Sequence, residues 1–245
     1  MRFSYNAVWE DTLGLLRRHL PLLVAIAGVF LFLPALLFAV LLPPPEPHGD
    51  PERAFQLVLA YYQAASPWFL AQGLFTMVGT LAMLRLVFAR DTVGGALTNG
   101  LMLLPFYFLL SLILVFIIMF GFILLIVPGL YLIGRLAPIS VVLVAENRRN
   151  PFDAIGRTFA LTKDRGWAVF GIVFVVVIVA GIAVSIASTL TGLIFVLAAG
   201  QTLGKLLAAV VVSALNAALG VLLTMLYAAI YRALAGTDPV AAAFE

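Results

Sequence analysis

Long apolar runs alternate with short polar connectors along the whole chain. An α-helix rises ~1.5 Å per residue, so about 20 apolar residues span the ~30 Å hydrocarbon core of a bilayer. Such runs predict an all-α fold, a polytopic membrane protein with one integral membrane domain over residues 1–245. The six predicted transmembrane helices cover about 21–42, 68–89, 101–127, 130–145, 167–190 and 206–231.

Two further segments place an apolar stripe beside charged residues at helical spacing, which is typical of helices that lie in a membrane interface. The first predicted interfacial helix covers residues 3–18. Its stripe contains Tyr5, Trp9, Leu13 and Leu16 and continues to Leu20. The second covers residues 151–163 and starts at an Asn-Pro pair that favours a helix N-terminus. Its stripe contains Phe152, Ile155 and Phe159.

These segments suggest an internal repeat. Residues 8–18 and 154–164 both carry a threonine in mid-helix and a basic residue five positions later. The connector 91–100 occupies the equivalent place before the third run. The pattern suggests three units of amphipathic helix plus helical hairpin, related by an axis along the membrane normal. The alternative is that interfacial helices precede the runs without any duplication.

Composition agrees with lipid as the solvent for most of the chain. The 245 residues are 64% hydrophobic and 10% charged, whereas a soluble domain carries roughly 25% charged residues. Cysteine is absent and there are two histidines, which argues against thiolate or multi-imidazole metal sites. We therefore expect no metal, no cofactor and no enzyme, because no nucleophile, acid pair or ligand cluster lies within a predicted span.

Basic residues are distributed unequally between the two sides that six spans would define. With the N- and C-termini in the cytoplasm, eleven of the fourteen basic residues face inward, which is a strong orientation signal. The eleven are Arg2, Arg17, Arg18, Arg85, Arg90, Arg148, Arg149, Arg157, Lys163, Arg165 and Arg232. Arg53 and Lys205 face outward. No basic stripe with interleaved aromatics indicates nucleic acid, so the expected partners are membrane lipids, including anionic phospholipid.

Arg135 is the sharpest candidate for a functional residue. It lies within the fourth predicted span, six residues after a helix break predicted at Pro128 and Gly129. A cation at that depth costs at least ~2.5–3.5 kcal/mol, so it needs a partner. The partner is either protein, such as unwound backbone near Pro128, a helix C-terminus or Glu146, or an anion from lipid or substrate.

The end of the fourth span supplies a second group of candidates. Glu146, Arg148 and Arg149 indicate a helix end at the inner interface, with contact to a lipid headgroup as the alternative. The remaining candidates are expected to hold the interfacial segments at the membrane surface. They are Arg17, Arg18, Arg157, Lys163 and Trp167.

Residues 128–167 resemble a known family. The pattern resembles the membrane domain of bacterial glycerophosphoryl diester phosphodiesterases and the related stand-alone YciC-type membrane proteins. The residues that carry it are Pro128, Gly129, Tyr131, Leu132, Arg135, Pro138, Glu146, Pro151, Ala154, Thr158, Leu161, Lys163 and Trp167. Thr158 stands where the pattern leads us to expect serine, and six spans leave no room for the catalytic barrel. The resemblance implies a multi-pass protein of the bacterial inner membrane without diesterase activity.

Two functional hypotheses remain. The first is a non-enzymatic inner-membrane scaffold or helper in envelope and lipid homeostasis. The second is a transporter or lipid-handling channel that binds an anion at Arg135. The sequence leaves substrate, protein partner and oligomeric state open.

Overall fold

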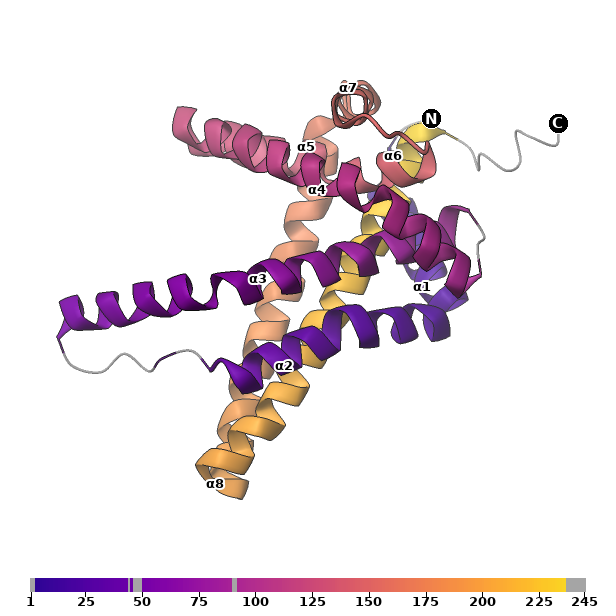
Figure 1. The fold of residues 1–245 in the computed structure, drawn as a ribbon. Coiled ribbons are helices and arrows are strands. Elements are labelled where there is room, and N and C mark those ends of the chain that lie inside the picture. The colour runs from indigo at the N-terminus through magenta and orange to yellow at the C-terminus, as the bar shows by residue number, and fades with distance from the viewer. Residues whose placement is uncertain (1–2, 44, 46–49, 90–91, 237–245) are drawn as a thin grey trace.

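The computed structural model describes residues 3–43, 45, 50–89 and 92–236, and these are almost entirely helical (Figure 1). Two of the predicted inward-facing residues, Arg2 and Arg90, lie outside this described part. The elements are α1 (Tyr5–Ala27), the π-helical turn η1 (Gly28–Phe32), α2 (Leu33–Leu41), α3 (Pro51–Phe88), α4 (Val93–Leu124), α5 (Ile126–Leu136), α6 (Ile139–Ala145), α7 (Pro151–Leu161) and α8 (Gly166–Ala235).

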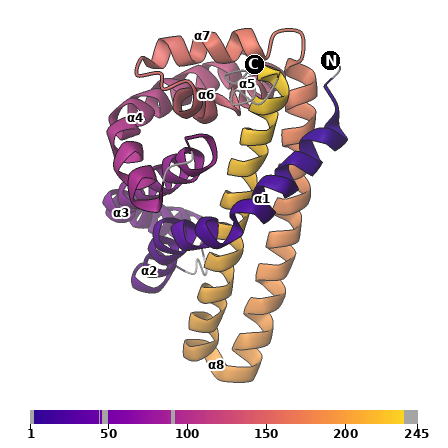
Figure 2. The ribbon, with the colours of Figure 1, turned by 90° about the vertical axis from the view of Figure 1, so that its right-hand side faces the viewer.

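Five stretches of the described chain are long and apolar enough to cross a membrane. They are Tyr5–Leu41, Pro51–Phe88, Val93–Leu124, Ile126–Ala145 and Gly166–Ala235. This is consistent with the predicted helical membrane protein. The fifth stretch, α8, folds back on itself as a hairpin (Figure 2). Gly200 lies at the bend with φ 76° and ψ 178°, a backbone conformation that is open essentially to glycine alone.

The apolar helices do not form a simple parallel bundle. Figure 1 shows α2 and α3 running across α8. Figure 2, turned by 90°, looks along α2 and α3 while α8 remains upright. Helices that cross in this way cannot all stand upright in one flat bilayer, so the structure does not confirm six spans.

Buried side chains concentrate at one end of the α8 hairpin. We call this region the packed end. It consists of α1, residues 78–88 of α3, residues 126–173, and residues 213–235 of α8. Residues 139–144 of α6 are all buried there, and so are Leu84 and Leu226. Three other helical parts, residues 51–77, 108–124 and 174–212, are mostly exposed, and we call them the apolar arms.

The first amphipathic segment is not a separate interfacial helix. Residues 5–18 belong to α1, which continues through Pro21 to Ala27. Its protein-facing side carries Val8 and Thr12, whereas Tyr5 and Trp9 of the predicted stripe are exposed. The connector 91–100 is likewise absorbed into α4 from Val93 onward. Of the three segments in the predicted repeat, only the one at α7 forms a helix separate from the helix that follows it. The structure therefore does not confirm a threefold repeat.

The helix break predicted at Pro128 and Gly129 is wrong by one turn. Helix α4 ends at Leu124, and Leu125 is extended, with φ −166° and ψ 155°. Pro128 occupies the first turn of α5, where the N–H that proline lacks would have no helical partner. In a continuous helix that missing N–H would face the carbonyl of Leu124, so the break falls before the proline. Gly129 instead provides a close approach, because a Cβ there would lie 2.6 Å from the ring of Phe122.

The fourth predicted span is not one helix. It divides into α5 and α6 at Ala137 and Pro138. Arg135 therefore lies in the last turn of α5. The break thus follows directly after the turn that carries Arg135.

Candidate functional site

Helix α7 lies over the rest of the packed end, and its first turn is fixed by local sequence. The side chain of Asn150 accepts a hydrogen bond from the backbone N–H of Phe152 at 3.0 Å, and Pro151 fills the first helical position. This confirms the helix start that the Asn-Pro pair predicts. In Figure 2, α7 lies across the end of the molecule where α1 begins and α8 ends.

The face by which α7 packs matches the predicted stripe in part, because Ile155 and Phe159 of the stripe pack against the core beside smaller residues. Pro151, Ala154 and Thr158 are buried, and Thr158 Oγ1 donates to the carbonyl of Ala154 at 2.7 Å. Phe152, which we expected in the stripe beside Ile155 and Phe159, is 68% exposed. The small residues allow α7 to lie close against its neighbours, which is how helices pack where lipid is the surrounding solvent.

Arg135 binds the C-terminal end of α7. Its Nε donates to Thr162 Oγ1 at 3.0 Å, and its Nη2 donates to the carbonyl of Phe159 at 3.1 Å. Thr162 is fully buried, and its own hydroxyl donates to the carbonyl of Thr158 at 2.7 Å. A guanidinium at a helix C-terminus interacts favourably with the unpaired carbonyls and the negative end of the helix dipole.

Aromatic rings complete the surroundings of Arg135. The guanidinium carbon lies 4.7 Å from the ring centre of Phe159 and 5.9 Å from that of Tyr131. Tyr131 in turn packs on Trp167 at a centroid distance of 4.7 Å. Cation–π contacts of this kind stabilise a partly desolvated arginine. Arg135 thus joins α5 to α7, and the rings extend the contact to the first turn of α8.

Among the partners considered for Arg135, the structure identifies a helix C-terminus. The expected contact with unwound backbone near Pro128 is wrong, because Pro128 is helical and the acceptors belong to α7. A guanidinium has five N–H donors. The two described hydrogen bonds use two of them, and the side chain is only partly buried.

Glu146 is placed by the way α6 ends. The N–H of Arg148 donates to the carbonyl of Leu143 at 3.0 Å, and that of Asn147 donates to Val144 at 3.3 Å. Asn147 has φ 49°, the left-handed conformation that asparagine tolerates better than most residues. This is a Schellman motif, and it makes Glu146 the C-cap. The helix end expected at Glu146 is therefore confirmed.

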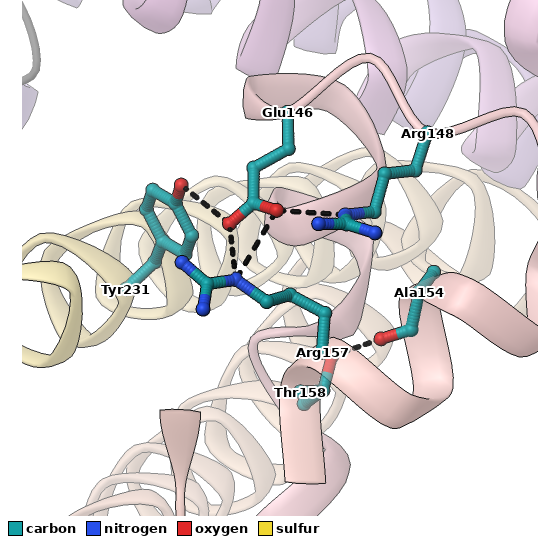
Figure 3. Close-up of polar contacts among 6 residues, drawn as sticks. All are labelled: Glu146, Arg148, Ala154, Arg157, Thr158 and Tyr231. Atoms are coloured by element: carbon teal, nitrogen blue, oxygen red, sulfur yellow. Dashed lines mark hydrogen bonds and ion pairs between the residues drawn. The ribbon is translucent and has the colours of Figure 1, made fainter. Parts of the chain in front are cut away.

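The Glu146 carboxylate joins three elements (Figure 3). Arg148 Nε donates to one oxygen at 2.7 Å, and Arg157 Nε on α7 donates to both oxygens, at 2.9 and 3.2 Å. The hydroxyl of Tyr231, near the end of α8, donates to the carboxylate at 3.2 Å. We call Glu146, Arg148, Arg157 and Tyr231 the Glu146 cluster.

The cluster controls the ionisation of Glu146. Burial disfavours the charged form, yet the hydrogen bonds and positive charges of Arg157 and Arg148 outweigh it and lower the pKa of the carboxyl below its ordinary value. Glu146 is therefore ionised at neutral pH, and its two arginines are held in fixed directions.

The other predicted residues lie apart from these contacts. Arg149 is exposed beside the cluster without joining it, and Lys163, Arg17 and Arg18 are also exposed. Trp167 is 61% exposed in the first turn of α8. The predicted anion site at Arg135, Glu146, Arg148 and Arg149 thus separates into the Arg135 contact with α7 and the Glu146 cluster.

Sequence reasoning missed several partners. Thr162 accepts from Arg135, Tyr231 donates to Glu146 from 85 residues away, and Arg232 Nη1 lies 3.0 Å from Asp11 Oδ1. For the contact between Arg232 and Asp11, the one signal in the sequence was that Arg232 flanks the last apolar run. No local pattern marks the other two, because their partners come close only when α5, α6, α7 and α8 pack together.

The described residues offer electrostatic contacts and no metal site. No group of three or more His, Cys, Asp or Glu side chains is gathered in the part of the chain that the structure describes. What these residues can do is bind anions, through the donors of Arg135, Arg148 and Arg157, and hold α7 in place. No family model matches the chain, and neither a curated protein nor a solved structure matches it.

Proposed function

We propose that the chain is a non-enzymatic integral protein of the bacterial inner membrane, a scaffold or helper in envelope and lipid homeostasis. The long apolar helices support membrane embedding. The resemblance of residues 128–167 supports placement in the bacterial inner membrane and a role in the envelope. The role we assign to the charged residues is to hold α7 as a cover on the packed end.

One observation carries this proposal: the guanidinium of Arg135 donates hydrogen bonds to the C-terminal end of α7. Its contacts with Thr162 Oγ1 and the Phe159 carbonyl use the charge to fasten one helix to another. The Glu146 cluster also fastens α7, because Arg157 of α7 forms an ion pair with Glu146 at the end of α6. Two separate charged contacts thus fix a single amphipathic helix.

The orientation is part of the proposal. The start of α1, the end of α8 and α7 lie at one end of the molecule (Figure 2). The basic residues there include Arg148, Arg157 and Arg232, and the positive-inside rule assigns such an end to the cytoplasm. With α8 taken as a membrane hairpin, α7 lies along the inner interface.

The second hypothesis is a lipid-handling channel or transporter with an anion site at Arg135. The observation that favours it is the partial burial of this guanidinium, which retains donors beyond the two that bind α7. In this case a bound anion would share Arg135 with the end of α7.

A single cysteine introduced into the naturally cysteine-free chain tests the proposal. Ala154→Cys lies on the fully buried face of α7, so in the intact protein its thiol should resist a membrane-impermeant maleimide. Arg135→Leu removes the contact with Thr162 and Phe159, and we expect it to make the Ala154→Cys thiol react at least several-fold faster. Arg135→Lys, which keeps the charge, should have a smaller effect.

Matched positions decide the outcome. Ala160→Cys on the exposed side of α7 should react at the same rate with or without Arg135. If Arg135→Leu leaves the Ala154→Cys thiol protected but abolishes binding of an anionic lipid, the channel hypothesis replaces the scaffold. If Arg149→Cys reacts in intact cells with reagent added outside, the proposed orientation is wrong.

A further inference from the structure

The two arginines of the Glu146 cluster use only part of their hydrogen-bonding capacity. Both bind the carboxylate through Nε, at 2.7 Å for Arg148 and 2.9 Å for Arg157. None of the bonds described in the structure for these two side chains involves an Nη atom. Each guanidinium therefore keeps the donors of its Nη groups for another acceptor.

The charges of the cluster do not cancel. One carboxylate faces two guanidinium groups, which leaves one positive charge in excess. Figure 3 shows the arginines on either side of Glu146. The carboxylate fixes their directions, so less conformational entropy is lost when the Nη groups bind a further anion. Planar guanidinium groups match phosphate oxygens in geometry as well as in charge.

The surroundings suit a phosphate that is attached to a lipid. The side chains of Arg148 and Arg157 are 35% and 41% exposed, so a ligand can reach them. Phe152 presents an exposed aromatic ring in the first turn of α7, four residues after Arg148. A helix that carries both arginine and an exposed Phe is typical of a helix lying in the membrane interface.

We propose that the Nη groups of Arg148 and Arg157, oriented by Glu146, form a binding site for the phosphate of an anionic phospholipid headgroup. This deepens the proposed function and rests on it, because it requires the α7 end to lie at the inner interface. It separates Arg148 and Arg157 from Arg149, which is equally basic but takes no part in the cluster, and from Arg135, which fastens α7.

Binding by the purified full-length chain tests the site. Short-chain phosphatidylglycerol, short-chain phosphatidylcholine and inorganic phosphate are titrated in a neutral detergent, with binding followed by intrinsic tryptophan fluorescence and calorimetry. We expect phosphatidylglycerol to bind most tightly. Arg148→Gln removes one charged donor group and should weaken this binding about tenfold. Arg149→Gln removes the same charge one residue away and should change it less than about twofold.

Further arms separate the remaining interpretations. Arg148→Lys keeps the charge without the planar fork and should bind phosphatidylglycerol several-fold more weakly than the native chain. Unchanged binding would mean that the charge alone binds the headgroup, which would contradict a role for the Nη groups. Equal losses in Arg148→Gln and Arg149→Gln would overturn the site in favour of general surface attraction. Inorganic phosphate binding as tightly as phosphatidylglycerol would overturn its assignment to a lipid.

Protection of the Ala154→Cys thiol keeps this result distinct from the test of the proposed function. If the Arg148 variants keep that thiol protected and also keep full lipid affinity, the headgroup site is wrong while the fastening of α7 stands. If the thiol is reactive in a chain that carries Ala154→Cys as its only change, this face of α7 is not covered and the scaffold proposal is wrong.

Discussion

The packed end and the apolar arms differ in charge as well as in organisation, because the packed end carries most of the charged residues and the arms carry few. Leu84 and Leu226 are fully buried at the packed end, whereas Leu197 in the α8 arm is 77% exposed. Ion pairs of Glu146 with Arg148 and Arg157, and of Asp11 with Arg232, join elements of the packed end. The arms carry apolar side chains toward the surroundings. In lipid such side chains gain little from burial, so close packing and polar contacts hold helices together.

The largest expected difference between the two regions concerns buried leucines. Leu226→Ala should lower the free energy of unfolding by about 2–5 kcal/mol, because it opens a cavity among fixed neighbours. Leu197→Ala should change it by less than about 0.5 kcal/mol. Unfolding in mixed micelles, followed by circular dichroism, measures both. Equal effects would mean that the arms are as tightly packed as the rest.

Glycine substitutions sharpen the comparison. A Cβ at Gly134 would lie 2.5 Å from the Cα of Phe170 on α8, so Gly134→Ala should destabilise the protein by about 1–3 kcal/mol. At Gly181 in the α8 arm a Cβ meets nothing within 4 Å. Gly181→Ala should stabilise by up to about 1 kcal/mol through helix propensity. Thermal unfolding of the two variants should shift in opposite directions, and a shared direction would contradict the described contact.

Acidification should loosen α7 through Glu146. Its pKa is lowered in the folded state, so its contribution is complete above the ordinary value of 4.5 and is lost as the pH falls through the lowered pKa. Glu146→Gln should remove about 1 kcal/mol at neutral pH and flatten this part of the pH dependence. Unfolding in mixed micelles at pH values on either side of this range measures the effect. An unchanged acid dependence in Glu146→Gln would assign it to another group.

The smallest expected effect concerns the contact between the ends of the chain. Arg232→Gln breaks the 3.0 Å pair with Asp11, and both side chains are partly exposed, so the loss should be below about 1 kcal/mol. Arg149→Gln serves as the control with no described ion pair and should have no measurable effect. A loss well above 1 kcal/mol for Arg232→Gln would show that this pair is more important than its exposure indicates.

Features governed by short stretches of chain could be predicted from the sequence. The apolar runs predict an all-helical membrane protein because backbone groups in lipid must bond within their own segment. The start of α7 follows from Asn150 and Pro151, and the helix end at Glu146 follows from the polar residues after an apolar run. Each depends on neighbours within one or two helical turns.

Other features were decided by tertiary structure alone. The periodicity of α1 identified Tyr5 and Trp9 as a stripe. It could not show that Val8 and Thr12 form the protein-facing side. Arg135 needed a partner on energetic grounds, yet Thr162 is 27 residues away, and Tyr231 reaches Glu146 across 85 residues. Hydropathy records which side chains avoid water and is the same for every arrangement of the helices. The choice among arrangements comes from close contacts such as that of Gly134 with Phe170, which exist only once the helices have packed.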